Sequence, residues 1–152
     1  MEQQLFRRIA VFRGSFSIDA AHAVCAADID TTESLVVKNL LRRRWGTGRL
    51  LMLDTIREYA WQQLDESEER HEVHRRHAEH FLGIAASTNL TSQKMIEGEP
   101  QHELALLEQD NFRAALTWAI NAREFALGLA LATELEQFWV QNDPAEGARW
   151  FR

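Results

Sequence analysis

The sequence predicts a mainly α-helical fold with one small β-hairpin. Apolar residues recur at helical spacing along most of the 152 residues, as they do in amphipathic helices. Residues 40–53 differ, because apolar positions alternate there around the turn Gly46-Thr47-Gly48, and glycine supplies the positive φ angles of a tight hairpin. With 45% apolar and 26% charged residues, the composition is that of an ordinary globular protein.

Three helical segments are expected before the hairpin. The first can end at Gly14, and Ser17 can cap the second. A polar loop over residues 27–31 leads to a third helix over about 32–38, which Asn39 can end. The buried faces of the first two helices would be apolar, formed by Leu5, Ile9, Phe12, Ala21, Val24 and Cys25.

The hairpin strands are expected over residues 40–45 and 49–53, and the helical period begins directly after them. Residues 55–58 have the spacing of a capping box, and Asp54 could cap the same helix end. Three helices, a hairpin and a further helix are the order of a winged helix, a variant of the helix-turn-helix architecture.

Beyond Leu64 the chain is predicted to be almost wholly helical. A helix to about Ser87 precedes a loop over 88–100, and a long helix then forms a helical hairpin with residues 125–141. Asp143-Pro144 is a cap followed by proline at the first helical position. We therefore expect a winged-helix domain at residues 1–66 and a helical domain at residues 67–152.

The last helix carries Trp150 and Phe151 and stops at Arg152. Burying an aromatic ring removes about 150–250 Å² from water, so a helix with two such rings is expected to cover a neighbour. We expect that the chain is a fragment cut inside a longer array of helix pairs, in which each pair needs the next. Trp139, Trp150 and Phe151 are the candidates for the interface with further repeats.

Several runs resemble one family in the expected order. VFRGSFSIDAAHAVC (11–25), SLVVKNLL (34–41) and RLLMLDTIREYAWQQL (49–64) resemble the winged-helix segment of bacterial STAND-type signal-transduction ATPases, transcriptional regulators that are similar to the NB-ARC class. Three further runs resemble the linking helix and first tetratricopeptide-like helices of these proteins: RRHAEHFL (75–82), LEQDNFRAALTWAI (107–120) and EGARWF (146–151).

The resemblance implies that an ATPase domain precedes the winged helix and that helical repeats after it receive the signal. It also implies that the winged helix holds the ATPase closed. No GxxxxGK[ST] phosphate loop is present, so ATP or ADP is implied for the parent protein and no cofactor for this chain. Met52, Leu53 and Asp54 occupy the nucleotide-sensing Met-His-Asp triplet of related ATPases, and leucine cannot hydrogen-bond a phosphate.

Charge is distributed unevenly along the chain. Residues 1–57 carry nine Lys or Arg against six Asp or Glu, whereas residues 58–152 carry eight against seventeen. Five basic residues lie in or beside the wing and are candidates for contact with DNA phosphates or an acidic partner: Lys38, Arg42, Arg43, Arg44 and Arg49. The third helix offers few side chains that could read bases.

No catalytic or metal-binding constellation is evident. His71, His74, His77 and His80 are spaced by three, so they drift around a helix and are expected to pack rather than bind a metal. The lone Cys25 lies on an apolar face and fits a buried thiol in a reducing compartment. No apolar run is long enough for a membrane span, which predicts a cytoplasmic protein.

These observations predict a non-catalytic regulatory fragment of a STAND-type ATPase. It would couple signals or partners bound by the helical repeats to the state of a nucleotide-binding domain. The alternative is an autonomous DNA-binding winged-helix transcription factor with a helical dimerisation or effector domain. A peptide-binding helical scaffold is the third possibility, because helical repeats expose concave surfaces.

Overall fold

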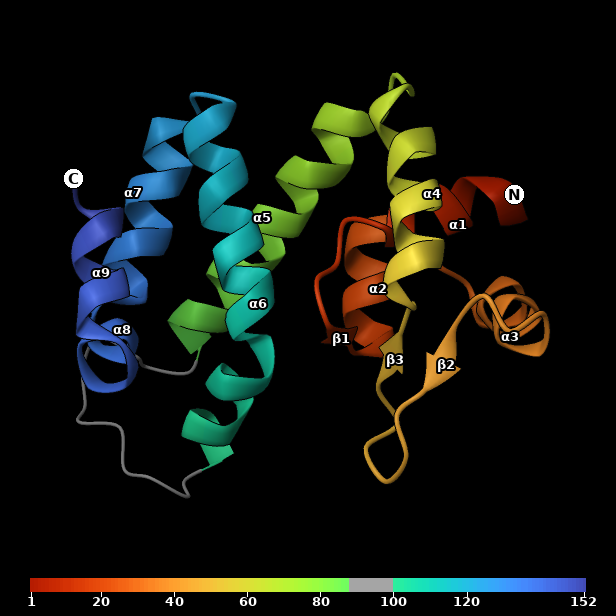
Figure 1. Ribbon diagram of the computed structural model, residues 1–152, viewed down its shortest axis with the longest axis horizontal. Helices are drawn as coiled ribbons and strands as arrows, with labels where there is room; N and C mark the ends of the chain where they lie inside the picture. The colour runs from red at the N-terminus through yellow and green to blue at the C-terminus, as the bar shows by residue number, and fades with distance from the viewer. Residues whose placement is uncertain (88–99) are drawn as a thin grey trace. The chain divides into compact units, whose positions relative to one another are not determined.

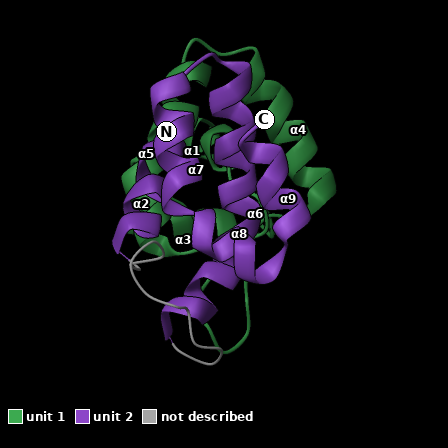
Figure 2. Ribbon diagram, turned by 90° about the vertical axis from the view of Figure 1, so that its left-hand side faces the viewer, with its two compact units in different colours: residues 1–77 green, residues 78–152 purple. Residues whose placement is uncertain are grey.

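The computed structural model describes residues 1–87 and 100–152. These residues form two compact units, residues 1–77 and residues 78–152 (Figure 2). Both are built mainly from helices, which confirms the predicted mainly α class. The boundary between the units falls inside helix α5 (Arg70–Ser87), and the division into domains at residue 66 stays a prediction.

The first unit contains the predicted sequence of three helices, a hairpin and a helix (Figure 1). Its sheet has three short antiparallel strands in the order β1-β3-β2, with Leu51 opposite both Ser15 and Arg42. The elements before α5 are α1 (Glu2–Ile9), β1 (Ser15–Phe16), α2 (Ile18–Cys25), α3 (Ile29–Val37), β2 (Arg42–Arg43), β3 (Leu50–Leu51) and α4 (Asp54–Asp65).

Strand β1 was not expected from the sequence. It contains two residues, too few to show the alternation that indicates a strand. Gly14, with φ of 70°, precedes it and turns the chain toward the hairpin. Strand β1 forms because it pairs with β3, which lies 34 residues further along the chain (Phe16 with Leu50). Only the tertiary fold brings these two segments together.

Two helix starts differ from the prediction. Helix α3 begins at Ile29, earlier than expected, because the Asp28 carboxylate accepts hydrogen bonds from the Thr31 backbone N–H (2.8 Å) and hydroxyl (2.6 Å). Asp54 does not cap α4: Leu53 is the capping position, and no side chain accepts a bond there. The predicted end at Asn39 is confirmed, since this residue has φ of 58° just beyond α3.

The core of the first unit is aromatic and aliphatic. Phe12 and Phe16 stack with ring centroids 4.4 Å apart, and the edge of His77 meets Phe12 at 5.5 Å. Helix α1 contacts α2, α3 and α4, so it is the central helix of the unit. The residues predicted to form the buried faces of the first two helices are all buried, including Cys25, but α1 ends at Ile9 and Phe12 lies beyond it.

Glu69, in the turn between α4 and α5, forms hydrogen bonds with side chains of α1. Its carboxylate accepts hydrogen bonds from Arg7 (3.1 Å), Arg8 (2.6 Å) and Gln4. Burial raises the pKa of this carboxyl, but the donated bonds outweigh that effect and hold its pKa at about 2. The ionised form therefore stabilises the folded unit.

The second unit contains the C-terminal part of α5 and helices α6 (Pro100–Asn121), α7 (Phe125–Glu134), α8 (Glu136–Asn142) and α9 (Pro144–Trp150). The helix predicted over 125–141 is divided into two helices at Leu135, where φ is −93° and ψ is 0°. The predicted cap at Asp143 is confirmed by its bond from the Glu146 backbone N–H (2.9 Å). Apart from Pro100, which begins α6, the predicted loop over 88–100 lies outside the described residues.

Aromatic rings connect the helices of the second unit. Phe112 meets Phe81 and Phe138 edge to face, with centroids 6.0 and 6.2 Å away, and Phe138 meets Trp139 at 4.8 Å. Arg113 of α6 then binds both carboxylate oxygens of Glu146 in α9 at 2.8 Å. These contacts join α5, α6, α8 and α9.

Gly147 allows α9 to approach α8 closely. A Cβ atom at this position would lie 2.7 Å from the Cβ of Trp139, a distance that real Cβ atoms essentially never show. We expect Gly147→Ala to lower the free energy of unfolding by about 1–3 kcal/mol, measured by urea denaturation. The matched control is Gly83→Ala in α5, where nothing lies within 4 Å; it should be neutral or stabilising by up to about 1 kcal/mol. Equal effects of the two substitutions would contradict this account.

The Glu69 cluster predicts a specific acid dependence. The folded-state pKa, about 2, lies below the ordinary value of 4.5, so the stabilisation is complete above about pH 5 and is lost as the pH falls through 2. We expect Glu69→Gln to lower the free energy of unfolding by about 1–3 kcal/mol at pH 7 and by progressively less toward pH 2. Urea titrations at several pH values measure this. Glu68→Gln, which changes an exposed neighbour, should have little effect at any pH.

Candidate interaction surface

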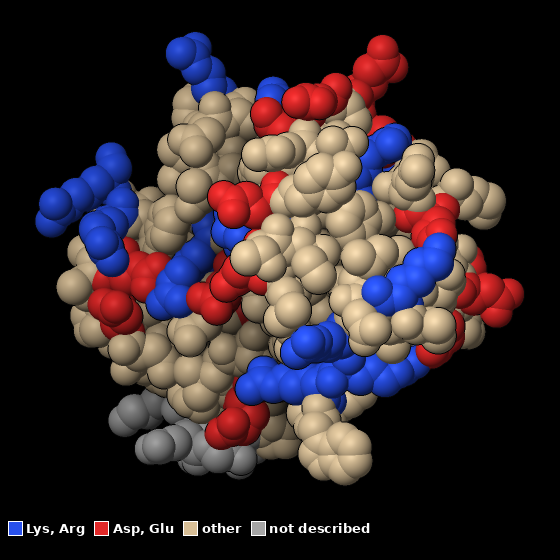
Figure 3. All heavy atoms as spheres, turned by 45° about the vertical axis from the view of Figure 1, so that its right-hand side comes forward, with Lys and Arg blue, Asp and Glu red and all other residues tan. Residues whose placement is uncertain are grey.

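The wing, which is the hairpin formed by β2, β3 and the turn between them (residues 42–51), carries most of the predicted contact residues. Arg42, Arg43 and Arg44 are exposed on β2 and the residue after it, and Lys38 lies exposed just after α3. Figure 3 brings this side of the molecule forward and shows a band of Lys and Arg side chains with acidic side chains beside it. The structure therefore places four of the five predicted basic residues at the surface.

Two of these four cations are paired with carboxylates. Arg43 forms an ion pair with Glu33 of α3, and Lys38 Nζ lies 2.6 Å from Glu2 Oε2 of α1. Within residues 1–87 and 100–152, Arg42 and Arg44 form no ion pair. The available positive charge of the wing is thus concentrated on these two guanidinium groups.

Arg49, the fifth predicted contact residue, does not lie at the surface, and this corrects the prediction. It is buried, its Nε donates to the Ser15 hydroxyl at 2.9 Å, and its Nη2 donates to the Ser15 carbonyl at 2.9 Å. The side chain therefore joins the hairpin to β1 and is not available for a partner. Sequence spacing could not show this, because an arginine beside a turn looks the same whether it points outward or into the fold.

The tip of the wing is a defined turn. Gly46 and Gly48 have φ of 77° and 67°, and the Arg44 backbone N–H donates to the Arg49 carbonyl at 2.7 Å. The Thr47 N–H also donates to the Arg44 carbonyl, at 3.3 Å. Trp45 stands at this tip with 99% of its surface exposed. Trp45 was not among the contact residues predicted from the sequence, and its place directly before a hairpin glycine is the signal that could have indicated it.

The outer face of α3 is apolar and acidic. Ile29 and Val37 are 74% and 78% exposed, and Asp30 and Glu33 are exposed between them. Ser34 is half-buried and donates its hydroxyl to Glu2 at 2.6 Å. Exposed apolar side chains on one helix face offer area that another protein surface could cover.

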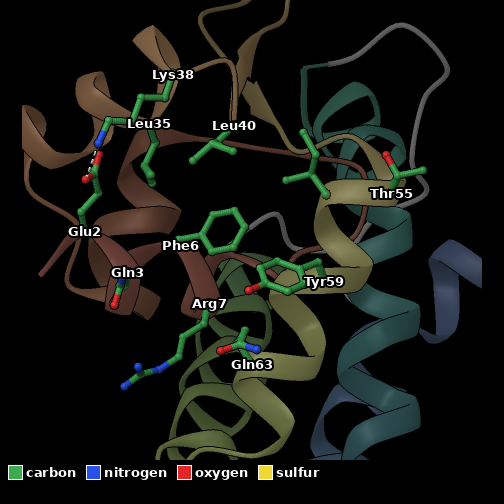
Figure 4. A pocket seen from close by; sticks show the side chains of 11 residues that line it. Glu2, Gln3, Phe6, Arg7, Leu35, Lys38, Leu40, Thr55, Tyr59 and Gln63 are labelled. Carbon is green, nitrogen blue, oxygen red and sulfur yellow. Dashed lines mark hydrogen bonds and ion pairs between the residues drawn. The ribbon is translucent and has the colours of Figure 1, made fainter.

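A groove lies between α1, α3 and α4 (Figure 4). Its volume is about 670 Å³, and Phe6 and Tyr59 lie beside each other along it, with ring centroids 6.2 Å apart. The Glu2–Lys38 ion pair lies at one end of the groove. These residues were not predicted as a site, because α1, α3 and α4 come together only in the folded unit.

The position that resembles the nucleotide-sensing triplet shows no ligand chemistry of its own. Met52 is buried, Leu53 is half-buried, and the side chain of Asp54 is 99% exposed with Arg57 4.0 Å away. Leu53 presents no hydrogen-bonding side chain. A role for Leu53 and Asp54 in sensing nucleotide stays a prediction of the resemblance.

Three of the four histidines of α5 contact aromatic rings, whereas His71 is exposed. His74 meets Trp61 at 5.0 Å, His77 meets Phe12, and His80 meets Phe81 at 5.1 Å. Burial, followed by the charge of Arg70, lowers the pKa of His74 to about 4, so its ring is neutral at pH 7. Among the described residues, no three His, Cys, Asp or Glu side chains gather as they would around a metal ion. Burial also raises the pKa of the Cys25 thiol, which makes it a poor nucleophile.

The predicted repeat interface is divided between core and surface. Trp139 of α8 is buried against Gly147 of α9, so it is a core residue of the second unit rather than part of an outer face. Trp150 is half-buried and Phe151 is 51% exposed. Both line a cleft of about 320 Å³ with Ile120, Phe125 and Leu129 of α6 and α7. The cleft is apolar, as a surface that receives another helix would be.

The chain resembles two mycobacterial proteins over 99% of its length. They are named "Putative HTH-type transcriptional regulator Rv0890c" from Mycobacterium tuberculosis (strain H37Rv) and "Putative HTH-type transcriptional regulator Mb0914c" from Mycobacterium bovis. Each is 34% identical to the chain over 162 aligned residues. The chain spans 18% of the length of these curated relatives.

Two further comparisons found no match. No family model matches the chain, and no solved structure matches it. None of the helices in the described ranges is both long enough and apolar enough to cross a bilayer.

Proposed function

We propose that the chain is a non-catalytic regulatory part of a cytoplasmic transcriptional regulator. The support is the similarity of nearly the whole chain to proteins named as such regulators. The order of elements in the first unit is that of a winged helix, and the second unit would begin an array of tetratricopeptide-like helix pairs. In this proposal the chain is one segment of a longer protein.

The surface of α3 carries the proposed mode of action, which is docking on another protein domain. A helix that reads DNA bases must lie between two rows of phosphates, which would repel the exposed carboxylate of Asp30 and compete with Glu33 for its partner Arg43. Ile29 and Val37 instead offer exposed apolar area to a protein partner. This face therefore fits a protein surface better than a DNA groove.

The proposed partner is a nucleotide-binding ATPase domain in the same protein, as the family resemblance implies. The first unit would hold this domain in its closed state, and signals or protein or peptide effectors bound by the helical repeats would release it. ATP or ADP would bind to the ATPase domain. The apolar cleft beside Trp150 and Phe151 would receive the next helix of the repeat array.

The docking proposal is tested in the full-length protein from which the chain comes. The coding sequence upstream of residue 1 should contain a phosphate-binding loop. Because a carboxylate at the centre of an apolar contact is costly, Val37→Asp should release the closed state and raise basal ATP hydrolysis several-fold, measured by phosphate release. Thr47→Asp, which adds the same charge at the exposed wing turn, is the matched control and should leave hydrolysis unchanged.

Either of two results would count against docking on an ATPase. One is an upstream sequence without a phosphate-binding loop. The other is equal hydrolysis by the wild type and Val37→Asp, with both proteins folded by circular dichroism.

A second candidate function is direct DNA binding through the wing. The names of the relatives favour it, since helix-turn-helix proteins bind DNA, and the unpaired guanidinium groups of Arg42 and Arg44 in the described structure could hold two phosphates. The relatives are more than five times as long as the chain, however, so the helix-turn-helix of their names need not be this segment. The two candidates use different faces of the same unit.

The DNA-binding candidate predicts salt-dependent binding of a duplex. Fluorescence anisotropy with a labelled duplex should give an affinity that falls steeply between 50 and 200 mM salt. Replacing both Arg42 and Arg44 by Ala should reduce the slope of log K against log salt by about 1.8, because two phosphate contacts are lost. The double variant Arg70→Ala, Arg76→Ala has the same net charge and should keep the wild-type slope. A duplex that does not bind at low salt rules out this candidate.

A further inference from the structure

We propose that the tip of the wing binds unpaired bases of nucleic acid, with Trp45 stacking on a base while Arg42 and Arg44 hold the adjacent phosphates. This inference rests on the second candidate function, DNA binding by the wing, and specifies its mode. The contact is made by the wing alone, without insertion of α3.

The exposure of Trp45 is the first observation. A fully exposed tryptophan leaves about 150–250 Å² of aromatic surface in water, and 99% of Trp45 is exposed. The rings of the other described tryptophans that enter ring contacts, Trp61 and Trp139, meet His74 and Phe138 inside their units. The indole of Trp45 has both faces open, which is the geometry that base stacking requires.

The turn presents the indole in a defined position. The bonds that join Arg44 to Arg49 and to Thr47 close the turn on either side of Trp45. Arg49 is in turn bonded to Ser15, so the base of the hairpin is fixed in the sheet. Binding would therefore lose less conformational freedom than it would with a flexible loop.

The charges at the tip of the wing indicate that its partner is a nucleic acid strand. Arg42 and Arg44 are two residues apart on extended chain, so their side chains leave the same side of the hairpin. Arg43, between them, is instead paired with Glu33. Two unpaired guanidinium groups beside one open indole match the alternation of phosphate and base along a nucleic acid strand.

The acidic face of α3 determines which nucleic acid fits. Glu33 meets the wing through its ion pair with Arg43, and the exposed Asp30 leaves a negative charge on α3 that opposes a duplex lying along this helix. Inserting an indole between paired bases also requires those bases to unstack, which costs free energy, whereas an unpaired base offers its face without that cost. A single strand or a locally opened duplex is therefore the preferred ligand.

The test compares the complete 152-residue chain with its variants on two labelled probes, a 20-nucleotide mixed-sequence single strand and the corresponding blunt duplex. We expect the single strand to bind more tightly at 100 mM salt. Trp45→Ala should weaken single-strand binding about 5- to 150-fold, the range that corresponds to about 1–3 kcal/mol per stacked base. Trp45→Phe keeps an aromatic face and should stay within about threefold of the wild type. Binding of the single strand should also quench the exposed component of tryptophan emission in the wild type and not in Trp45→Ala.

Tyr59→Ala is the matched control, because it removes an exposed aromatic ring from α4 of the same unit and should not affect binding. Duplex binding that depends on Arg42 and Arg44, with no effect of Trp45→Ala on either probe, overturns the stacking proposal and leaves the second candidate function standing. Absence of binding to both probes overturns both. Vesicles of phosphatidylserine that bind the wild type but not Trp45→Ala, with neither nucleic acid bound, would assign the tip to a membrane surface and also overturn the proposal.

Discussion

The orientation of the wing depends on the buried guanidinium group of Arg49. It donates to both the hydroxyl and the carbonyl of Ser15, across a separation of 34 residues. A two-residue strand has too few ladder bonds to be stable by itself, so this contact helps to hold β1 on β3. Because a buried arginine without acceptors would cost several kcal/mol, the two bonds from Arg49 to Ser15 help to stabilise the sheet.

The first unit therefore presents two chemically different surfaces, the outer face of α3 and the tip of the wing, in a fixed orientation relative to each other. The sheet fixes the hairpin, the Glu33–Arg43 ion pair links the hairpin to α3, and α1 packs on α3 and α4. The face of α3 is apolar and acidic, whereas the tip of the wing is aromatic and basic. Protein docking through α3 and nucleic acid binding through the wing are therefore compatible within one regulator, since neither proposed contact uses the residues of the other.

Two partly buried charged groups among the described residues, Glu69 and Arg113, are each held by more than one bond. Glu69 accepts from three side chains, and Arg113 binds Glu146 with two. Each arrangement joins elements that are distant in sequence, α1 to the turn before α5 and α6 to α9. Such multiply bonded pairs tolerate burial because the hydrogen bonds offset the loss of hydration. They explain how small units with short helices keep a defined geometry.

Much of the fold could be predicted from local signals. Ser17, Asn39 and Asp143 mark helix ends through their own backbone or side-chain bonds, and Gly46 and Gly48 determine the hairpin turn, so these features need no tertiary information. Strand β1 and the break at Leu135 could not be predicted in this way. One depends on a partner strand far along the chain, and the other is a change of backbone angle at a buried leucine without a glycine or proline to indicate it.

The candidate site also has some features that follow from local sequence and others that depend on the tertiary structure. The sequence by itself determined that a basic hairpin follows three helices and precedes a fourth, because composition and turn chemistry are local properties. Only the tertiary structure decided that Arg49 is buried, that Arg43 is paired with Glu33 and that Trp139 lies in the core. It also placed Trp45 in the open and Ile29 and Val37 on the outer face of α3. Whether a side chain is exposed or paired depends on elements brought together from distant parts of the chain, and local sequence carries no record of them.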